Sequence, residues 1–446
     1  MRRVCAVLCL TAVACAGDDN RSLGDRTRQY LTDLVRLDTS NPPGHESAAA
    51  TYLKQVADSF GIPAELMGTP NRMNFVARLK GNGKGRPLLL MAHSDVWPAD
   101  PKQWSSDPFG AQVRDGFLYG RGTLDAKGLL AAELSVMVEI KRRKLNLNRD
   151  LILVSEADHE VGMSGIQWLI QNAWGKIDAE FALNTGSSIR ETKDGSKIFE
   201  VQVAEKVPMR VLLSARGSFG TGAVPRPDNP IVHLSRAVTR LSEADQPIVF
   251  NATTRRYLTD LSMLADYNWL APLIPKLDNP ATALATAGQI RMRDPELDAL
   301  LHTTVSVPAN TELDVRRMPS ESRDEVLTRL RQIVNDSAVE LTIGPGVVPP
   351  ATEPSPRRMS PLYTAMQRAI ARIYPHDAVV TPTMSRATTD ASFLRARGMP
   401  VYGVPVFVRE PGESKVHSVD ERISLKSLDD GVELLWQMVL EAAGEN

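Results

Sequence analysis

Short, almost wholly apolar runs alternate along this chain with longer stretches in which apolar residues recur every three or four positions. Residues 88–92 and 151–154 are runs of the first kind, which suits strands buried on both faces. The helical spacing is found at residues 21–37, 47–60, 129–138 and 425–443. Buried strands that alternate with amphipathic helices predict an α/β sheet.

Residues of metal-binding or acid–base type follow four of the apolar runs. They are His93 with Asp95, the triplet Asp158-His159-Glu160, Asn184 with Thr185, and, after a loop, His417. Because the chemistry of an α/β sheet collects beyond the carboxyl ends of its strands, we expect these side chains to lie near one another. Two histidines, an aspartate and a glutamate are the donor set of a zinc-type metal site.

A glycine-flanked turn at residues 118–128 carries a further carboxylate, Asp125, just ahead of a helix. Glycines let the backbone approach a bound ion closely, and a carboxylate in such a turn is a natural metal ligand. An aspartate that only caps the helix is the ordinary alternative. The four segments described above favour the metal-site interpretation.

Five motifs together resemble one known family. They are His93-Ser-Asp95-Val-Trp-Pro98, Gly120-Arg-Gly-Thr-Leu-Asp125-Ala-Lys-Gly128, Asp158-His-Glu160-Val-Gly162, Asp178-Ala-Glu-Phe-Ala-Leu-Asn184, and Thr389-Asp390 followed by His417-Ser-Val-Asp-Glu421. In this order they are similar to the M20 family of zinc metallopeptidases and amidohydrolases, which includes carboxypeptidase G2, aminoacylase-1 and succinyl-diaminopimelate desuccinylase. The resemblance implies an α/β fold, with a mixed-sheet zinc-hydrolase catalytic domain and an inserted α+β lid and dimerisation domain.

The pattern changes at about Val207, where the resemblance places the inserted domain. We expect a catalytic domain in two parts, residues 24–206 and 346–446, and a lid domain over residues 207–345 that forms homodimers in the family. Strands are expected at residues 209–214 and 311–316, helices at residues 229–243 and 320–335, and a polar, proline-containing region in between, up to about residue 302.

The resemblance also assigns roles at the metal site. It places Asp125 between two zinc ions, with His93 on one ion and Glu160 and His417 on the other. Asp95 would accept a hydrogen bond from His93 and orient its ring. The implied substrate is a small peptide or an N-acyl amino acid, whose amide bond a metal-activated water would cleave.

Four positions depart from the family pattern. His159 stands where the family has the glutamate that acts as general base, and Thr185 stands where it has a carboxylate ligand. In the lid, Thr221 replaces a substrate-binding histidine, and the loop at residues 305–308 is shortened. These departures fall at the reacting centre, so they bear directly on activity.

The threonine weakens one of the two ion positions. Because Thr185 offers only a neutral oxygen, the His93 ion keeps two firm ligands, fewer than the three of a catalytic zinc site. The other ion keeps three, from Asp125, Glu160 and His417. We therefore expect one or two zinc ions per chain, with cobalt or manganese as alternatives.

His159 has three interpretations at this stage. It could be the general base, since a neutral imidazole has an unperturbed pKa of about 6.5. It could instead bind metal and block the water, or be a solvated turn residue without a role. The predicted function is accordingly a metallohydrolase with Asp95 and His159 as catalytic residues. The alternative is an impaired relative that acts as a binding or surface protein.

Composition and charge exclude one class of partner. The chain has 446 residues, 43% apolar and 24% charged, with a net charge of −1. This composition suits a globular protein large enough for two domains. The near-zero charge gives no electrostatic footprint for nucleic acid, so no nucleic-acid partner is expected.

Residues 1–16 have the features of an export signal, with two arginines, an apolar core and small residues at the end. Ala14-Cys-Ala16 fits ordinary signal-peptidase cleavage, whereas Ala12-Val-Ala-Cys15 resembles a bacterial lipobox with a lipid anchor at Cys15. We expect an exported protein, in the bacterial periplasm or held at the membrane by that anchor, with secretion as the alternative. All three cysteines lie in this leader, so the mature chain has no disulfide.

Overall fold

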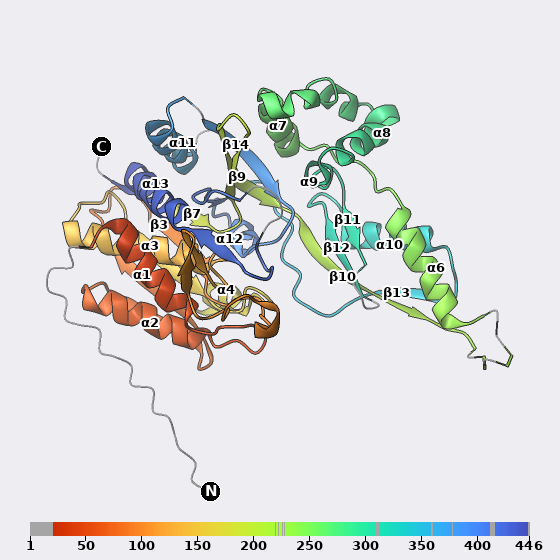
Figure 1. The fold of residues 1–446 in the computed structure, drawn as a ribbon, viewed down its shortest axis with the longest axis horizontal. Helices are drawn as coiled ribbons and strands as arrows, with labels where there is room; N and C mark the ends of the chain where they lie inside the picture. Colours follow the sequence, from red (N-terminus) through yellow and green to blue (C-terminus); the bar gives the residue numbers. More distant parts are fainter. Residues whose placement is uncertain are drawn as a thin grey trace, which may run out of the picture.

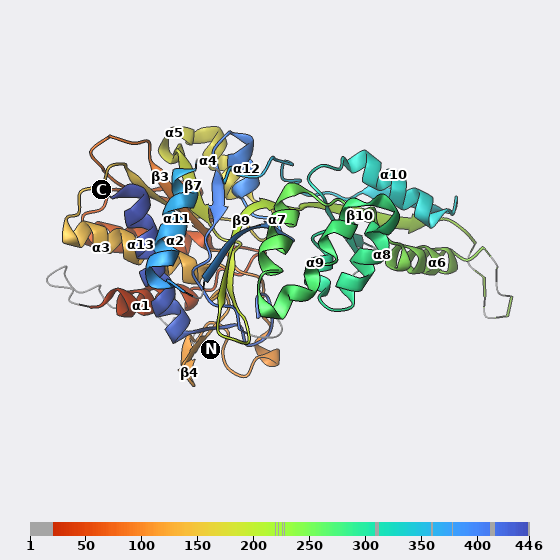
Figure 2. The ribbon, with the colours of Figure 1, turned by 90° about the horizontal axis from the view of Figure 1, so that it is seen from above.

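The computed structural model describes residues 21–218, 220–221, 223–224, 226, 228–307, 312–357, 360–376, 378–410 and 415–444. The predicted signal peptide and Cys15 lie outside the described residues. Two units, each with a sheet of its own, lie side by side along the long axis of the molecule (Figures 1 and 2). The predicted α/β fold with a mixed sheet is confirmed.

The larger unit is built on a nine-stranded sheet. In spatial order its strands are β1 (Ala64–Thr69), β2 (Arg72–Leu79), β6 (Leu151–Glu156), β3 (Leu88–His93), β7 (Phe181–Asn184), β15 (Val401–Gly403), β9 (Lys197–Glu205) and β14 (Ala378–Ser385), with β8 (Ser188–Glu191) paired to β9. The strands β6, β3, β7 and β15 run parallel to their neighbours within this group. Their carboxyl ends therefore meet at one edge of the sheet.

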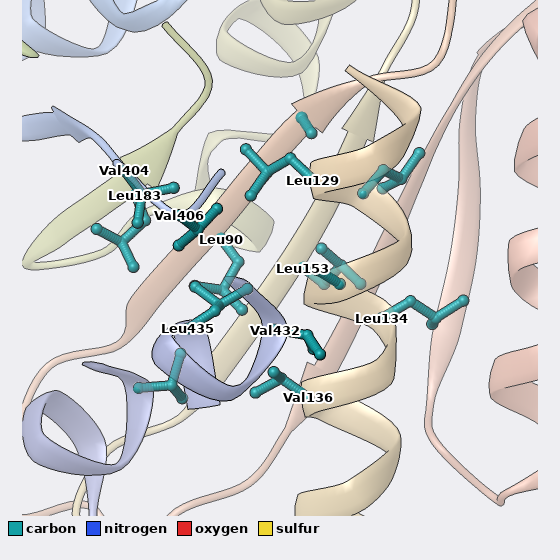
Figure 3. Close-up of a cluster of buried hydrophobic side chains, with 14 of the residues drawn as sticks. Leu90, Leu129, Leu134, Val136, Leu153, Leu183, Val404, Val406, Val432 and Leu435 are labelled. Carbon is teal, nitrogen blue, oxygen red and sulfur yellow. The ribbon is translucent and has the colours of Figure 1, made fainter. Parts of the chain in front are cut away.

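Every residue of β3 and β6 is buried, because helices cover both faces of the sheet. Leu90 and Leu153 point to one face, where they pack beneath two of the helices (Figure 3). The helices of that face are α1 (Leu23–Val35), α2 (Glu46–Ser59), α3 (Lys127–Arg143), α11 (Pro361–Ile373) and α13 (Leu425–Ala443). Leu89 and Ile152 point to the other face. It is covered by α4 (Ser164–Asn172), α5 (Trp174–Ile177) and α12 (Ala391–Ala396).

A small sheet joins two distant parts of the chain next to the edge just described. Its order is β16 (Arg422–Ser424), β5 (Phe117–Tyr119) and β4 (Gln112–Arg114), and the short helix η1 (Pro101–Gln103) precedes it in sequence. The pairing of β16 with β5 is antiparallel. It brings the segment that follows His417 against the strand that leads into the glycine-rich turn of Asp125.

The smaller unit has a four-stranded antiparallel sheet in the order β11 (Thr304–Ser306), β12 (Glu312–Arg317), β10 (Val207–Ala215) and β13 (Val339–Ile343). Buried and less buried residues alternate along β10, as expected where only one face is covered. The helices predicted at residues 229–243 and 320–335 form as α6 (Pro230–Glu243) and α10 (Arg323–Val334), and they pack on that face.

Residues 244–302, which showed only polar and proline-rich character in sequence, contain a helical segment. It consists of α7 (Ala252–Leu261), η2 (Ala265–Leu270), η3 (Ile274–Asp278), α8 (Pro280–Arg291) and α9 (Pro295–Asp298). Its apolar side chains form a separate cluster that includes Ile198 of β9. The segment therefore packs on the large sheet, next to β14, rather than in the core of the smaller unit (Figure 1). Among the helices of the described residues, none is long and apolar enough to cross a membrane.

Candidate metal centre

Asp125 lies between two imidazoles. One of its oxygens is 3.0 Å from His93 Nε2, and the other is 3.2 Å from His417 Nε2. Glu160 Oε1 is in turn 3.1 Å from the same nitrogen of His417. The structure thus brings together all four residues predicted as metal ligands. Two imidazoles and two carboxylates form a donor set that fits a zinc-type ion, which these four side chains would hold.

Four separate elements deliver these side chains. His93 is the last residue of β3, and Glu160 stands in the turn after β6. Asp125 precedes α3, and His417 lies in the loop before β16. Donor atoms of His93, Asp125 and Glu160 all lie within 4.8 Å of one another. The common edge of the parallel strands therefore assembles the site, as predicted from the sequence.

A buried carboxylate, Glu421, holds the turn that carries Asp125. It accepts hydrogen bonds from the backbone N–H groups of Gly122 (3.1 Å) and Leu124 (2.9 Å) and from Arg121 Nη1 (2.7 Å). Gly122 has a φ of 89°, a left-handed conformation that favours glycine. The turn is thus fixed by the segment that follows His417.

Asp95 supports the site through both its backbone and its side chain. The nearer partner of His93 Nδ1 is the backbone carbonyl oxygen of Asp95, at 3.0 Å, whereas the carboxylate is 3.5 Å away. That carboxylate accepts the backbone N–H groups of His159 (3.1 Å) and Glu160 (2.9 Å) and the side-chain amide of Asn41 (2.8 Å). Because these donors occupy its oxygens, the carboxylate orients the turn that carries Glu160, and the main chain orients His93.

His159 is enclosed within the site. Its side chain is only 10% exposed, and its Nδ1 is hydrogen-bonded to Asp390. Its ring stacks on that of His93, with centroids 4.0 Å apart and planes 7° apart. The interpretation as a solvated turn residue is therefore wrong. The sequence marks Asp390 only as part of a motif, because its partner His159 lies 231 residues away.

The carboxylates of the site favour the protonated form of His417 and would equally favour a bound cation. Burial lowers the pKa of His417, but hydrogen bonds to Asp125 and Glu160 outweigh it and raise that pKa to about 10. Burial also opposes ionisation of Asp125, yet its bonds to His417 and His93 hold its pKa well below the ordinary value. Metal binding would displace protons from these imidazoles, so its strength depends on pH.

Two predicted departures can now be located. Thr185 follows β7, and its N–H donates to the side-chain oxygen of Asn184 at 2.8 Å. Thr221 lies in an exposed turn of the smaller unit, paired with Val224.

Sequence reasoning missed two further side chains around the site. Trp97, which is 46% exposed, stacks on His417 with ring centroids 5.3 Å apart. Glu156 is buried near His159 and Asp390. Its position at the end of an apolar strand, like that of His93, was the signal that could have identified it.

Comparison with known proteins supplies the context. Residues 89–441 match the sequence profile of Peptidase family M20/M25/M40. Human N-fatty-acyl-amino acid synthase/hydrolase PM20D1 is 26% identical over 378 residues, which cover 80% of this chain and 74% of that protein. A succinyl-diaminopimelate desuccinylase from Cereibacter sphaeroides is 23% identical over 399 residues, which cover 89% of this chain and 93% of that protein.

Solved structures of similar fold include two peptidases. The M20 family metallo-carboxypeptidase Sso-CP2 from Sulfolobus solfataricus gives a TM-score of 0.67 at 19% identity, with 94% of this chain and 99% of that chain covered. The di-peptidase Dug1p from Saccharomyces cerevisiae gives a TM-score of 0.68 at 14% identity, with 94% and 96% covered. At these identities the likeness establishes the shared fold.

Proposed function

Since the chain belongs to peptidase family M20/M25/M40, we propose that it is a metal-dependent hydrolase that cleaves the amide bond of a dipeptide or an N-acyl amino acid. The observation that carries the proposal is the position of Asp125 between His93 and His417, with one oxygen toward each ring. The substrate class is supported by relatives named as an N-fatty-acyl-amino acid hydrolase, a desuccinylase and a di-peptidase.

His93, Asp125, Glu160 and His417 would hold the metal. Two imidazoles and two carboxylates suit zinc best, as one or two ions per chain, and they also accept cobalt or manganese. When bound, the metal supplies a Lewis acid for the amide carbonyl and lowers the pKa of a water molecule. The remaining chemistry belongs to the side chains around it.

His159 is the proposed general base. Asp390 accepts the Nδ1–H of His159, which fixes the tautomer and leaves the Nε2 lone pair free to take a proton from the attacking water. Burial and the neighbouring charge of His93 lower the pKa of His159, but Asp390 raises it to a net value above normal. The same imidazole can then return the proton to the leaving amine. Asp95 is a positioning residue, because its carboxylate holds the backbone of His159 and Glu160.

One observation favours a second candidate, a binding protein that has lost turnover. Thr185 provides no carboxylate where the family has a metal ligand, and its neighbour Asn184 is also neutral. A site with reduced metal content would still recognise an acyl amino acid. Turnover separates the two candidates.

The proposal extends to assembly and location. β13 is an edge strand of the smaller sheet, and the outward-facing backbone groups of an edge strand can pair with a second copy of this chain. We therefore propose a homodimer. Residues 207–345 would form its lid domain, and residues 24–206 and 346–446 its catalytic domain. Light scattering on the purified protein tests this assembly.

The leader at residues 1–16 leads us to propose export, with or without lipid at Cys15. Cys15→Ser should then release a membrane-bound fraction.

The deciding experiment measures zinc per chain and turnover on the same sample. The protein is loaded with zinc chloride, desalted and analysed for metal, then assayed on a panel of dipeptides and N-acyl amino acids. We expect one or two zinc ions and hydrolysis, and Asp125→Asn should bind less zinc and lose hydrolysis. Bound zinc without hydrolysis would favour the binding protein, and a chain that binds no zinc would contradict the proposal.

A further inference from the structure

A second group of metal-binding side chains lies beside the site around Asp125. Donor atoms of Glu156, His159 and Asp390 lie within 4.8 Å of one another. Glu156 ends β6, His159 stands in the turn that follows, and Asp390 immediately precedes α12. The group shares no residue with the cluster of His93, Asp125 and Glu160. It touches that cluster through the stacked rings of His93 and His159.

The carboxylates of this group are buried without the partners that buried carboxylates need. Glu156 and Asp390 are both 0% exposed. No donor group among the described residues meets either oxygen of Glu156 or Oδ1 of Asp390, and the two carboxyl groups can bond to each other only through a proton held between them. An unpaired carboxylate in the interior carries a large desolvation cost, so this arrangement calls for a cation or a shared proton. Burial, aided by the charge of Asp390, raises the pKa of Glu156 well above normal.

We propose that Glu156, His159 and Asp390 form a second site for a divalent cation of zinc type, separate from the site around Asp125. One imidazole nitrogen and two carboxylates are a donor set that zinc, cobalt and manganese accept. The oxygens of Glu156 and Oδ1 of Asp390, which no donor group meets, are the atoms that a cation would satisfy. An ion beside His93 would find only the neutral side chain of Thr185 where the family has a carboxylate. An ion in the second site would have two carboxylates, those of Glu156 and Asp390.

Occupancy of this second site has a consequence for hydrolysis, and that consequence rests on the proposed function. A cation held by His159 occupies the imidazole that we assign as the general base. Turnover should therefore rise as the site around Asp125 fills and fall when the second site fills. The existence of the second site does not depend on turnover.

The chain offers a matched control for the test. Glu133, in the middle of α3, is also fully buried, and the backbone of Met91 provides a hydrogen bond to it, whereas no charged side chain contributes to its raised pKa. It belongs to neither cluster of donor atoms. Glu156→Gln and Glu133→Gln therefore make the same chemical change in the same kind of environment. What sets Glu156 apart as a possible ligand is the histidine and the second carboxylate that stand beside it.

The experiment counts cations per chain with cobalt(II) as the probe. The full chain is stripped with a chelator, titrated with cobalt chloride, desalted and analysed for metal, and its visible absorption is recorded. Wild type and the two glutamine variants are compared. They are then compared again in the Asp125→Asn background, which disables the first site, and far-ultraviolet circular dichroism checks folding.

We expect Glu156→Gln to hold one equivalent of cobalt fewer than wild type, and Glu133→Gln to match wild type. Asp125→Asn should retain one equivalent, and the double variant with Glu156→Gln should lose it. If Glu156→Gln keeps every equivalent of wild type, the inference is overturned, and a proton shared between Glu156 and Asp390 satisfies the pair instead. If Asp125→Asn fails to fold, the comparison in the wild-type background still decides. If wild type holds the second equivalent, but hydrolyses no substrate even when zinc fills only the site around Asp125, the proposed function is rejected and the second site stands.

Discussion

Replacement of Glu421 by glutamine should disturb both the stability of the chain and its hold on metal. Glu421 is 0% exposed, and its carboxylate joins Arg121 to the backbone of the turn that carries Asp125. Arg121 is itself only 3% exposed. Glu421→Gln removes the negative charge and turns an amide N–H₂ toward groups that only donate. The one oxygen that remains can accept either from Arg121 or from the backbone N–H groups, so one of these two sides lacks an acceptor, and in both cases Arg121 loses its counter-charge.

The magnitude follows from these contacts. Removal of one partner of a buried ion pair costs about 3–5 kcal/mol, because the remaining charge is left unpaired in the interior. We therefore expect Glu421→Gln to lower the free energy of unfolding by that amount. Since the turn presents Asp125 to the metal, we also expect metal affinity to fall by about 10- to 100-fold, the effect typical of lost support for a ligand.

Urea unfolding measures the first quantity, and zinc competition against a chromophoric chelator measures the second. Asp430→Asn is the matched control, because it breaks an ion pair with Lys426 whose side chains are 43% and 82% exposed. Such an exposed pair contributes at most about 1 kcal/mol. The double variant Arg121→Met/Glu421→Met should regain part of the stability, because it leaves no unpaired charge. The reasoning is refuted if Glu421→Gln costs no more than Asp430→Asn, or if zinc affinity does not change.

Three further changes are predicted. Asp390→Asn removes the carboxylate that holds His159, so kcat should fall by about 10²- to 10⁴-fold, and steady-state rates equal to wild type would contradict the assignment of the base. Burial raises the pKa of Glu133 well above its ordinary value of 4.5, so the folded chain keeps a proton that the unfolded chain releases, and stability falls as pH rises above that value. Glu133→Gln should flatten this decline in a series of Tm measurements, and an unchanged pH profile would count against a buried, protonated glutamate. Glu296→Gln should cost more than the ~1 kcal/mol of a single exposed pair in urea unfolding, since the α9 side chain pairs with three guanidinium groups of the larger unit, those of Arg190, Arg386 and Arg409.

The parts of the fold that were predictable are those whose burial is recorded locally in the sequence. β3 and β6 are covered on both faces, so each appears as a continuous apolar run. The terminal helix shows its amphipathic spacing over its whole length, and α13 begins and ends at the predicted residues. The grouping of His93, Asp125, Glu160 and His417 was predictable because each stands in a short motif next to such an element.

The helical segment between residues 252 and 298 was not predicted because its signals are weaker. Its helices are short and its apolar positions few, so no periodic stripe stands out among the prolines. The signals that were present are capping residues, since Asn251 and Asn279 each accept a hydrogen bond from the first turn of a helix. The proline at the start of α8 is favourable there rather than disruptive.

The pairing of His159 with Asp390 could not be derived from local pattern at all. It joins residues 231 positions apart, and only the packing of α12 against the large sheet brings them together. The same holds for the choice between the carbonyl and carboxylate oxygens of Asp95 as the partner of His93. Both depend on side-chain positions that spacing along the chain does not specify.

The most direct test of the account is the rate at which the zinc-loaded protein and its His159→Ala and His159→Glu variants hydrolyse an N-acyl amino acid or dipeptide. If His159 is the base, wild type should turn over, and the alanine variant should lose about 10²-fold or more in kcat with zinc still bound. The glutamate variant should retain or exceed the wild-type rate, because a carboxylate can take the same proton. Equal rates for all three proteins would contradict the assignment of His159, and no turnover by any of them would contradict the proposed activity itself.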